Sequence, residues 1–230
     1  WGNEWIGNDD FCFYGDYLAT TGAENFLTIL DISEPENAHE VCRYRHDRSG
    51  EKVDIWDDFA YVAVAGFCYV IDLRDIANPQ LTDTLNSWQL HQFGDQNAIS
   101  TYGSSILQFD LSNPGRPEMI NTIETQTDFQ ADIKIKDGYA FIIGEIPDHP
   151  ETRSIQIWNF SDFQNPAQIA NIPGVFEQIE IDDEILLAVS HPQDYFLYNI
   201  AEPANPELLA RNRFRNERPL FIFFQNSNIY

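Results

Sequence analysis

The chain has 230 residues, of which 43% are hydrophobic and 14% aromatic, so it can bury a core and is too apolar for a disordered segment. It carries 13 basic and 37 acidic residues, a formal net charge of −24. Because phosphate groups are bound by clustered lysine and arginine, this charge argues against a nucleic-acid partner and an anionic membrane surface. The longest apolar run, 59–71, is too short for a membrane helix and contains Gly66, so membrane insertion is not expected.

A single phrase recurs along the chain: an apolar strand that ends in Asp or Asn, followed by a turn that contains proline. The first copy is FLTILDISEP at 26–35. The Asp or Asn that anchors each copy occupies positions Asp31, Asp72, Asp110, Asn159 and Asn199. The steps between these anchors are 41, 38, 49 and 40 residues, and a nearly fixed period of this size is typical of repeat proteins.

Each repeat divides into four short strands, the first two joined by a turn such as Gly15-Asp16 or Asp137-Gly138, which tolerates positive φ. The predicted repeats are 10–44, 53–85, 90–123, 132–172 and 178–212, and 219–230 opens another. Four antiparallel strands in about 40 residues predict an all-β fold, a β-propeller of five four-stranded blades and the start of a sixth. A β-sandwich is the alternative, but it does not require a repeated phrase. We expect one partial propeller over 1–230, part of a larger ring in a longer chain.

The repeated phrases resemble those of the LVIVD-repeat family of bacterial and archaeal proteins. The resemblance is carried by 27–35, 69–73 and 107–114, by the Asn-Pro pairs that end at Pro79, Pro166 and Pro206, and by FAYVA at 59–63. It implies a propeller that is secreted or displayed at the cell surface, often within a larger chain. The resemblance implies no shared catalytic residues, so no catalytic role is carried over to this chain.

The anchor residues have two interpretations. Five carboxylates and amides in register suggest a ring of metal ligands, but a short polar side chain at a strand end also hydrogen-bonds the backbone that follows it. We expect the second role, because the anchor accompanies every turn and Asn replaces Asp in two copies. The three cysteines, Cys12, Cys42 and Cys68, have no metal-binding spacing and are predicted to be small core residues. A Cys12–Cys42 bridge within the first repeat is the alternative, which the spacing does not argue for.

The step of 49 residues has a local cause, a long predicted loop over 145–153 in the fourth repeat. Insertions in repeat proteins map to loops, often on the binding face, and this loop class shares a face with the segments that join one blade to the next. The predicted interaction face comprises Arg45, His46, Asp47, Arg48, Glu145, Asp148, His149, Arg153, His191 and Asp194. His46, His149 and His191 are weak candidates for a divalent cation, because a wide ring would hold their three blades apart. No other cofactor is expected.

Three functional hypotheses follow. The first is a non-enzymatic scaffold, extracellular or at the cell surface, that binds a protein or a glycan through its loop-rich face. The second is a hydrolase or lyase with its site in the central depression of the propeller, near Asp54, Asp132, Lys134 and Glu180. The third is a structural segment of a larger surface fibre or complex. The chain contains no nucleophile elbow, zinc-protease helix motif or phosphate-binding loop, which favours the first hypothesis over the second.

The acid excess with only three lysines is typical of proteins from salty media, marine or halophilic, where ions screen the self-repulsion of the chain. Solubility alone is the other explanation. If the medium is salty, the midpoint of thermal unfolding should rise by several degrees between low and molar NaCl. An unchanged midpoint would contradict the salt interpretation and leave solubility as the reason for the charge.

Overall fold

The computed structural model describes residues 8–22, 25–48, 50–125, 127–146, 149–190, 194–213, 224–225 and 228–229. Side chains are described at all of these positions except 8, 9, 129–131, 146, 149–152, 224–225 and 228–229. Strands dominate these ranges, and their one helical segment is the short 3-10 turn η1 (Pro35–Asn37). The search for membrane-spanning helices, made over the same ranges, found none of sufficient length and apolarity.

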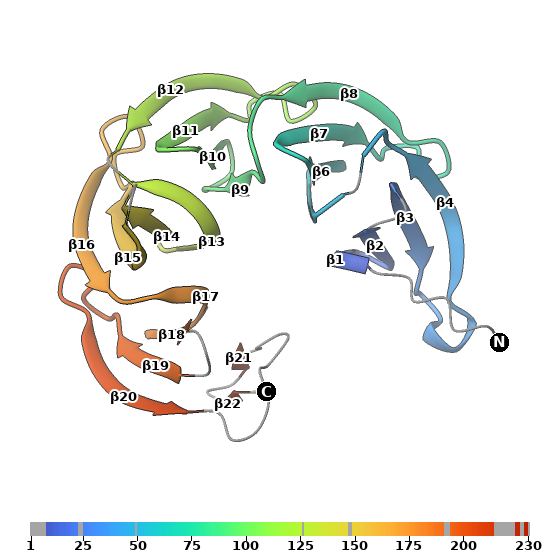
Figure 1. Cartoon of the computed structure of the whole chain (residues 1–230). Helices are drawn as coiled ribbons and strands as arrows, with labels where there is room; N and C mark the ends of the chain where they lie inside the picture. Colours follow the sequence, from blue (N-terminus) through green and yellow to red (C-terminus); the bar gives the residue numbers. More distant parts are fainter. Residues whose placement is uncertain are drawn as a thin grey trace. The chain divides into compact units, whose positions relative to one another are not determined.

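Five four-stranded antiparallel sheets make up the fold, each with its strands side by side in chain order (Figure 1). The first two sheets consist of β1 (Asn8–Tyr14), β2 (Tyr17–Gly22), β3 (Phe26–Asp31), β4 (His39–Arg45), β5 (Lys52–Trp56), β6 (Phe59–Val64), β7 (Phe67–Asp72) and β8 (Gln80–Leu85). The third consists of β9 (His91–Gln92), β10 (Asn97–Tyr102), β11 (Ser105–Asp110) and β12 (Glu118–Glu124). The last two consist of β13 (Asp128–Lys136), β14 (Tyr139–Ile146), β15 (His149–Asn159), β16 (Ala167–Pro173), β17 (Phe176–Asp182), β18 (Ile185–Ser190), β19 (Asp194–Asn199) and β20 (Glu207–Arg213).

These five sheets confirm the predicted five blades of four strands. The region predicted to open another blade contains two short paired strands, β21 (Phe224–Gln225) and β22 (Asn228–Ile229). Most of 219–230 lies outside the described residues, so the sixth blade stays a prediction.

The chain divides into two compact units, 1–102 with 106–122 and 103–105 with 123–230. In the first unit one apolar cluster joins the first and second sheets, and another joins the second and third. In the second unit a cluster that contains Phe141, Ile157, Phe176 and Tyr198 joins the fourth and fifth sheets. The middle strands of the second sheet are therefore covered on both faces, and all six residues of β6 are buried. This explains the weak alternation of apolar and polar residues in their sequences.

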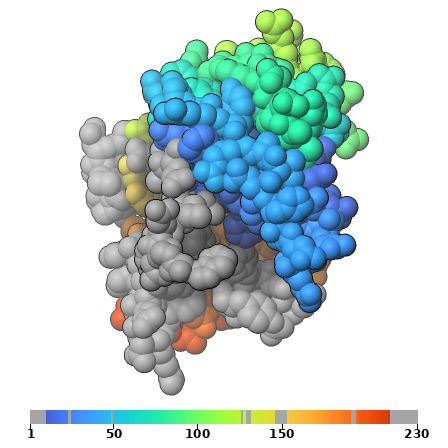
Figure 2. Space-filling view, turned by 90° about the vertical axis from the view of Figure 1, so that its right-hand side faces the viewer, coloured from blue at the N-terminus to red at the C-terminus, as the bar shows by residue number. Residues whose placement is uncertain are grey.

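The outermost strand of a sheet is far more exposed than its middle strands. Every residue of β20 is exposed, and so are most residues of β12. In Figure 2 the light-blue atoms of the region around β4 lie on the surface that faces the viewer.

The anchor residues shape the turns, as predicted. In each copy a side-chain oxygen of the anchor accepts the backbone N–H of the residue two positions later, at 2.7–2.9 Å. A second hydrogen bond also recurs: the residue that follows each anchor donates its N–H, at 2.8 Å, to a carbonyl in the turn between the first two strands of its sheet. The third strand of every sheet is thereby fastened to the first hairpin, and Asn serves as well as Asp because both present an acceptor oxygen.

The outer strand carries a β-bulge at the same place in four sheets. In the fourth sheet Ile157 pairs with Ala170 but Trp158 pairs with Gln168, so that Ile169 has no partner of its own. Equivalent shifts of register follow Ile29, Val70 and Leu197, each two positions before its anchor. In a regular strand, side chains two positions apart share a face of the sheet. Because the bulge inserts one extra residue, side chains three positions apart share a face where the bulge lies between them.

The prediction of a long loop over 145–153 is wrong. Strand β14 continues to Ile146 and β15 begins at His149, and these two residues pair with each other, so a longer hairpin replaces the loop. Pro147 and Pro150 favoured a loop in the sequence. Cross-strand pairing instead continues through a register shift between Gly144 and Ile146.

The recurrent anchor contact leads to a test at Asp110, whose carboxylate accepts the N–H of Ser112 at 2.7 Å. Asp110→Ala should lower the free energy of unfolding by about 1 kcal/mol, because one side-chain-to-backbone hydrogen bond is lost. Asp110→Asn is the matched control and should stay close to the wild type, since Asn159 and Asn199 make the same contact. Urea unfolding measures both, and equal losses in the two variants would contradict the role assigned to the anchor.

Candidate functional site

Every sheet has one end that carries the turn between its second and third strands and the segment that leads to the next sheet. We call this the connector end. In the first sheet it carries Arg45, the last residue of β4, and the segment 46–48. In the fourth and fifth sheets it carries Glu145, the backbone of His149, Arg153 and Asp194. Asp148 and His191 of the predicted face lie outside the described residues.

In the first unit the residues of the predicted face are held by local contacts. His46 is only 4% exposed, and its ring nitrogen Nδ1 lies against the carbonyl oxygen of Arg48. Asp47 accepts the hydroxyl of Tyr69, and the Arg48 guanidinium lies 5.3 Å from the centre of the Phe67 ring. The exposed part of this segment is therefore Asp47 and Arg48, while His46 is part of the interior.

In the second unit opposite charges are paired across neighbouring strands. Arg153 Nε lies 3.1 Å from Glu145 Oε2 across the β14–β15 hairpin. Asp194 accepts hydrogen bonds from Arg211 and Arg213, both at 2.8 Å, and these bonds hold the pKa of its carboxyl below the ordinary value. These two carboxylates are therefore paired with arginine, although the chain as a whole is strongly acidic.

The metal hypothesis stays a prediction. His191 and the side chain of His149 lie outside what the structure describes, and Nε2 of His46 is buried without a hydrogen-bond partner. Within the described ranges, no three His, Cys, Asp or Glu side chains come close enough together to hold a metal ion.

Charged side chains of the first strands also meet, as the second functional hypothesis expects. Lys134 Nζ, on β13, lies 2.9 Å from Glu180 Oε1 on β17 and 3.9 Å from Asp132 Oδ1. Burial raises the pKa of Glu180, and the Lys134 ammonium opposes that rise. Asp132 also accepts the N–H of Ile179 at 3.2 Å, and so links the two sheets. Asp54, in the first unit, accepts the Gln89 amide at 2.8 Å.

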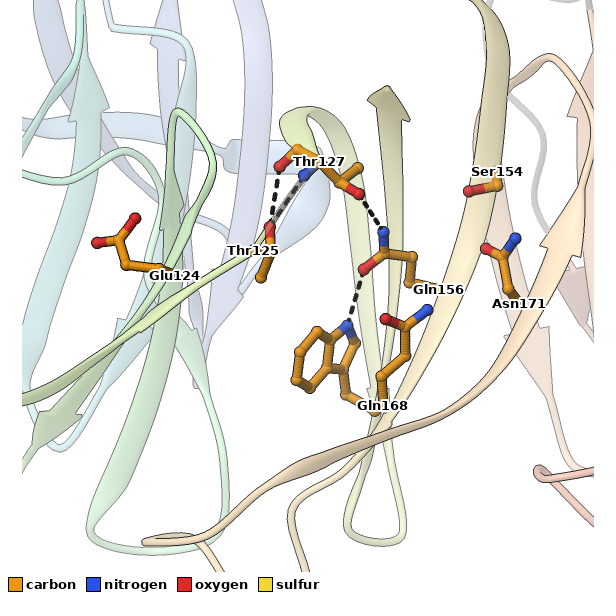
Figure 3. Close-up of a pocket in the computed structure, with 8 residues that line it drawn as sticks. Glu124, Thr125, Thr127, Ser154, Gln156, Gln168 and Asn171 are labelled. Atoms are coloured by element: carbon orange, nitrogen blue, oxygen red, sulfur yellow. Dashed lines mark hydrogen bonds between the residues drawn. The ribbon is translucent and has the colours of Figure 1, made fainter. Parts of the chain in front are cut away.

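A polar cavity of about 470 Å³ was not foreseen from the sequence (Figure 3). Its lining residues, all in the second unit, are Glu124, Thr125, Thr127, Ser154, Gln156, Trp158, Gln168 and Asn171. A chain of hydrogen bonds crosses the wall: Gln156 Nε2 donates to Thr127 Oγ1 at 2.6 Å, and Trp158 Nε1 donates to Gln156 Oε1 at 3.0 Å. Gln156 and Trp158, 5% and 7% exposed, are thus fixed in place.

The β-bulge explains how the far side of this cavity is built. Gln156 pairs with Asn171, and Trp158 with Gln168, so two cross-strand pairs place four side chains on one face. Without the unpaired Ile169, the glutamine and the asparagine of β16 would point to opposite faces. Thr125, Thr127 and Ser154 lie at the connector end, and Ser154 directly follows Arg153. The cavity therefore adjoins Arg153, in the part of the predicted interaction face that belongs to the second unit.

The polar lining had a signal in the sequence that is visible only with the repeats aligned on their anchors. The positions one and three before the anchor hold Tyr198 and Phe196 in the fifth repeat and Ile71 and Tyr69 in the second. There they lie in or against apolar clusters. In the fourth repeat they hold Trp158 and Gln156, so an amide occupies the position where the second and fifth repeats have an aromatic ring.

Comparison with solved structures defines the class of protein as a β-propeller. A functionally unknown protein from Desulfotomaculum acetoxidans aligns with a TM-score of 0.72 and 14% identity over 92% of this chain and 73% of that one. A periplasmic gluconolactonase from Pseudomonas aeruginosa gives 0.69 and 10% identity over 86% and 68%. BamB from Moraxella catarrhalis gives 0.64 and 11% over 90% and 64%. The chain thus spans about two thirds of the length of such structures.

The sequence comparison then identifies the repeats themselves. Residues 9–46 and 47–86 each match the model of the LVIVD repeat, which confirms the resemblance for two adjacent repeats. Apart from Asn8, the first residue of β1, these segments cover the first two sheets, from β1 to β8. Comparison with curated protein sequences gave no match.

The buried histidine leads to a prediction about pH. Burial lowers the pKa of His46 below its ordinary value, against the opposing hydrogen bond to the Arg48 carbonyl. When the pKa of a histidine is lower in the folded state than its unfolded value of about 6.5, the unfolded chain binds the proton first as the pH falls. The folded state therefore keeps its full stability above about pH 6.5 and loses stability below that value. Wild type should therefore lose stability between pH 8 and pH 5, and the difference in stability between wild type and His46→Gln should shrink. Urea midpoints at both pH values measure this.

His39→Gln, at an exposed position, is the control for the effect of replacing a histidine at the surface. A difference between wild type and His46→Gln that is the same at pH 8 and pH 5 would contradict the prediction.

Proposed function

We propose that the chain is a non-enzymatic binding module, secreted or displayed at the cell surface, that holds a protein or a glycan at the connector ends of its sheets. The observation that carries the proposal is the polar cavity beside the β14–β15 hairpin, with its ordered chain from Thr127 through Gln156 to Trp158. A concave site with a few fixed polar groups is the usual form of a ligand-binding pocket, and its volume falls in the usual range of about 300–1,000 Å³.

The surroundings of the cavity support binding over chemistry. Its lining has one carboxylate, Glu124, and neither a lysine, an arginine nor a histidine. General acid–base catalysis needs a positioned pair of proton-transfer groups, and nucleophilic catalysis needs a base beside the nucleophile. Hydroxyls and amides serve recognition instead. The extracellular location is an expectation of the LVIVD resemblance, and it fits the periplasmic origin stated for the gluconolactonase of similar fold.

The second candidate is an enzyme, and the cluster of Asp132, Lys134 and Glu180 favours it. A carboxyl with a raised pKa beside an ammonium group is a candidate acid or base. The similarity to a gluconolactonase suggests a lactone as the first substrate to test. Turnover of a lactone that disappears in both Lys134→Met and Glu180→Gln would favour the enzyme over the binding module.

Binding at the connector end is tested by reversing one charge there. The immobilised chain is exposed to a panel of oligosaccharides and to secreted proteins, and the dissociation constant of each ligand that binds is measured. Arg153→Glu should weaken binding at least fivefold, because it breaks the pair with Glu145 and the repulsion between two carboxylates displaces the hairpin that borders the cavity. Arg74→Glu is the matched control, since Arg74 is also paired with an acid, Asp72, but at the other end of its sheet.

Arg74→Glu should keep the dissociation constant within twofold of the wild type. Equal effects of the two variants would contradict binding at the connector end. The absence of any ligand, together with lactone turnover, would overturn the proposal.

A further inference from the structure

The lining of the cavity restricts the charge of its ligand. Glu124 is its one ionisable side chain, and the chain as a whole carries a net charge of −24. Phosphate and carboxylate groups are bound by arginine, lysine or a helix N-terminus, and the lining offers none of these. A divalent cation requires several oxygen ligands of which carboxylates are the strongest, and a single carboxylate does not provide them. The lining therefore provides no built site for an anion or for a divalent metal ion, and its uncharged hydrogen-bonding groups suit a neutral ligand.

The hydrogen-bonding groups restrict the ligand further. Three of the lining side chains are primary amides, Gln156, Gln168 and Asn171, and each amide has two N–H donors and two acceptor positions. The chain through Thr127 and Trp158 uses one donor and one acceptor position of Gln156, so half of the capacity of this amide lies outside the chain. Groups that both donate and accept are complementary to hydroxyls, which also do both.

The indole adds an apolar wall of fixed orientation. Trp158 is held by its own N–H, which donates to Gln156, and it faces Gln168 across the strand pair. The indole offers apolar area beside the polar amides. A sugar ring is complementary to this pair of features, because it has C–H bonds on its faces and hydroxyls at its rim.

We propose, as a deeper form of the binding function above and resting on it, that the cavity binds one or two sugar units of a neutral glycan. In this site Gln168 and Asn171 contact the hydroxyls from the exposed side, and Trp158 and Gln156 form the fixed wall. The pairing Trp158↔Gln168 and Gln156↔Asn171, made possible by the bulge at Ile169, is the feature that builds it. The corresponding pairs in the fifth sheet are Tyr198↔Leu208 and Phe196↔Arg211, which lack this set of amides.

The test uses the whole chain and a panel of small sugars. The neutral probes are methyl glycosides of glucose, galactose, mannose and N-acetylglucosamine, with their di- and trisaccharides. The anionic probes are glucuronic acid and glucose 6-phosphate. Saturation-transfer NMR identifies the sugars that bind, and calorimetry measures their dissociation constants with and without EDTA. We expect at least one neutral sugar to bind, independently of EDTA, and at least tenfold more tightly than its anionic counterpart.

Variants then locate the binding. The double variant Gln168→Ala/Asn171→Ala should weaken binding of the neutral sugar at least tenfold, and because both side chains are exposed it should fold normally. The matched control Gln164→Ala/Asn212→Ala removes one exposed glutamine and one exposed asparagine elsewhere in the second unit and should stay within twofold. Glu124→Gln should narrow the gap between neutral and anionic sugars, because it removes the carboxylate that repels the anions. Thermal unfolding confirms that each variant is folded.

Two results would overturn the inference without touching the wider proposal. One is a glycan or protein that the chain binds equally well in the Gln168→Ala/Asn171→Ala variant, which would place binding elsewhere. The other is a preference for the anionic sugars. If the chain binds neither sugars nor proteins, there is no dissociation constant for Arg153→Glu to change, and the proposed binding function itself fails.

Discussion

The structure depends on a simple constraint: a middle strand such as β6 is apolar on both faces, so a sheet built on such strands cannot be stable in water by itself. β6 is buried along its whole length, and the clusters that cover it come from the sheets before and after it within the first unit. At about 25 cal/mol per Å² of apolar surface removed from water, this shared burial is the main stabilising contribution. The anchors and turns also fix the order of the strands, but each sheet depends first on packing against the neighbouring sheets for its stability.

The fourth sheet shows what happens when this constraint is relaxed on one face. Ile155 and Ile157 of β15 lie in the apolar cluster shared with the fifth sheet, whereas Gln156 and Trp158, on the opposite face, line a polar cavity. Burying an amide costs free energy unless it is hydrogen-bonded, and here Thr127 and the indole N–H satisfy it. Apolar packing and the polar cavity thus occupy the two faces of a single strand.

Much of the fold could be predicted because it is encoded in local patterns: the period of the anchors, the turn residues and the doubly apolar strands. The family resemblance was visible for the same reason. The hairpin over 145–153 was mistaken for a loop, because proline content says nothing about whether a neighbouring strand offers a partner. His46 was placed on the surface, although its ring lies in a space beside Gly50, where a side-chain methyl would meet the imidazole at 3.2 Å. The cavity depends on which residues pair across β15 and β16, and a one-residue bulge changes that pairing without a clear mark in the sequence.

The unpaired residue on the outer strand has a consequence for how such a protein can diversify. The bulge shifts the register of the outer strand by one residue. The residues before the bulge and the residues after it therefore follow separate alternations between the two faces of the sheet. Substitutions at positions 168 and 171 can therefore alter one wall of a single blade while the ladder between β14 and β15, and the sheets beyond it, keep their alignment. An array built this way can acquire a new recognition surface in one module at a time, and the other modules continue to supply the framework.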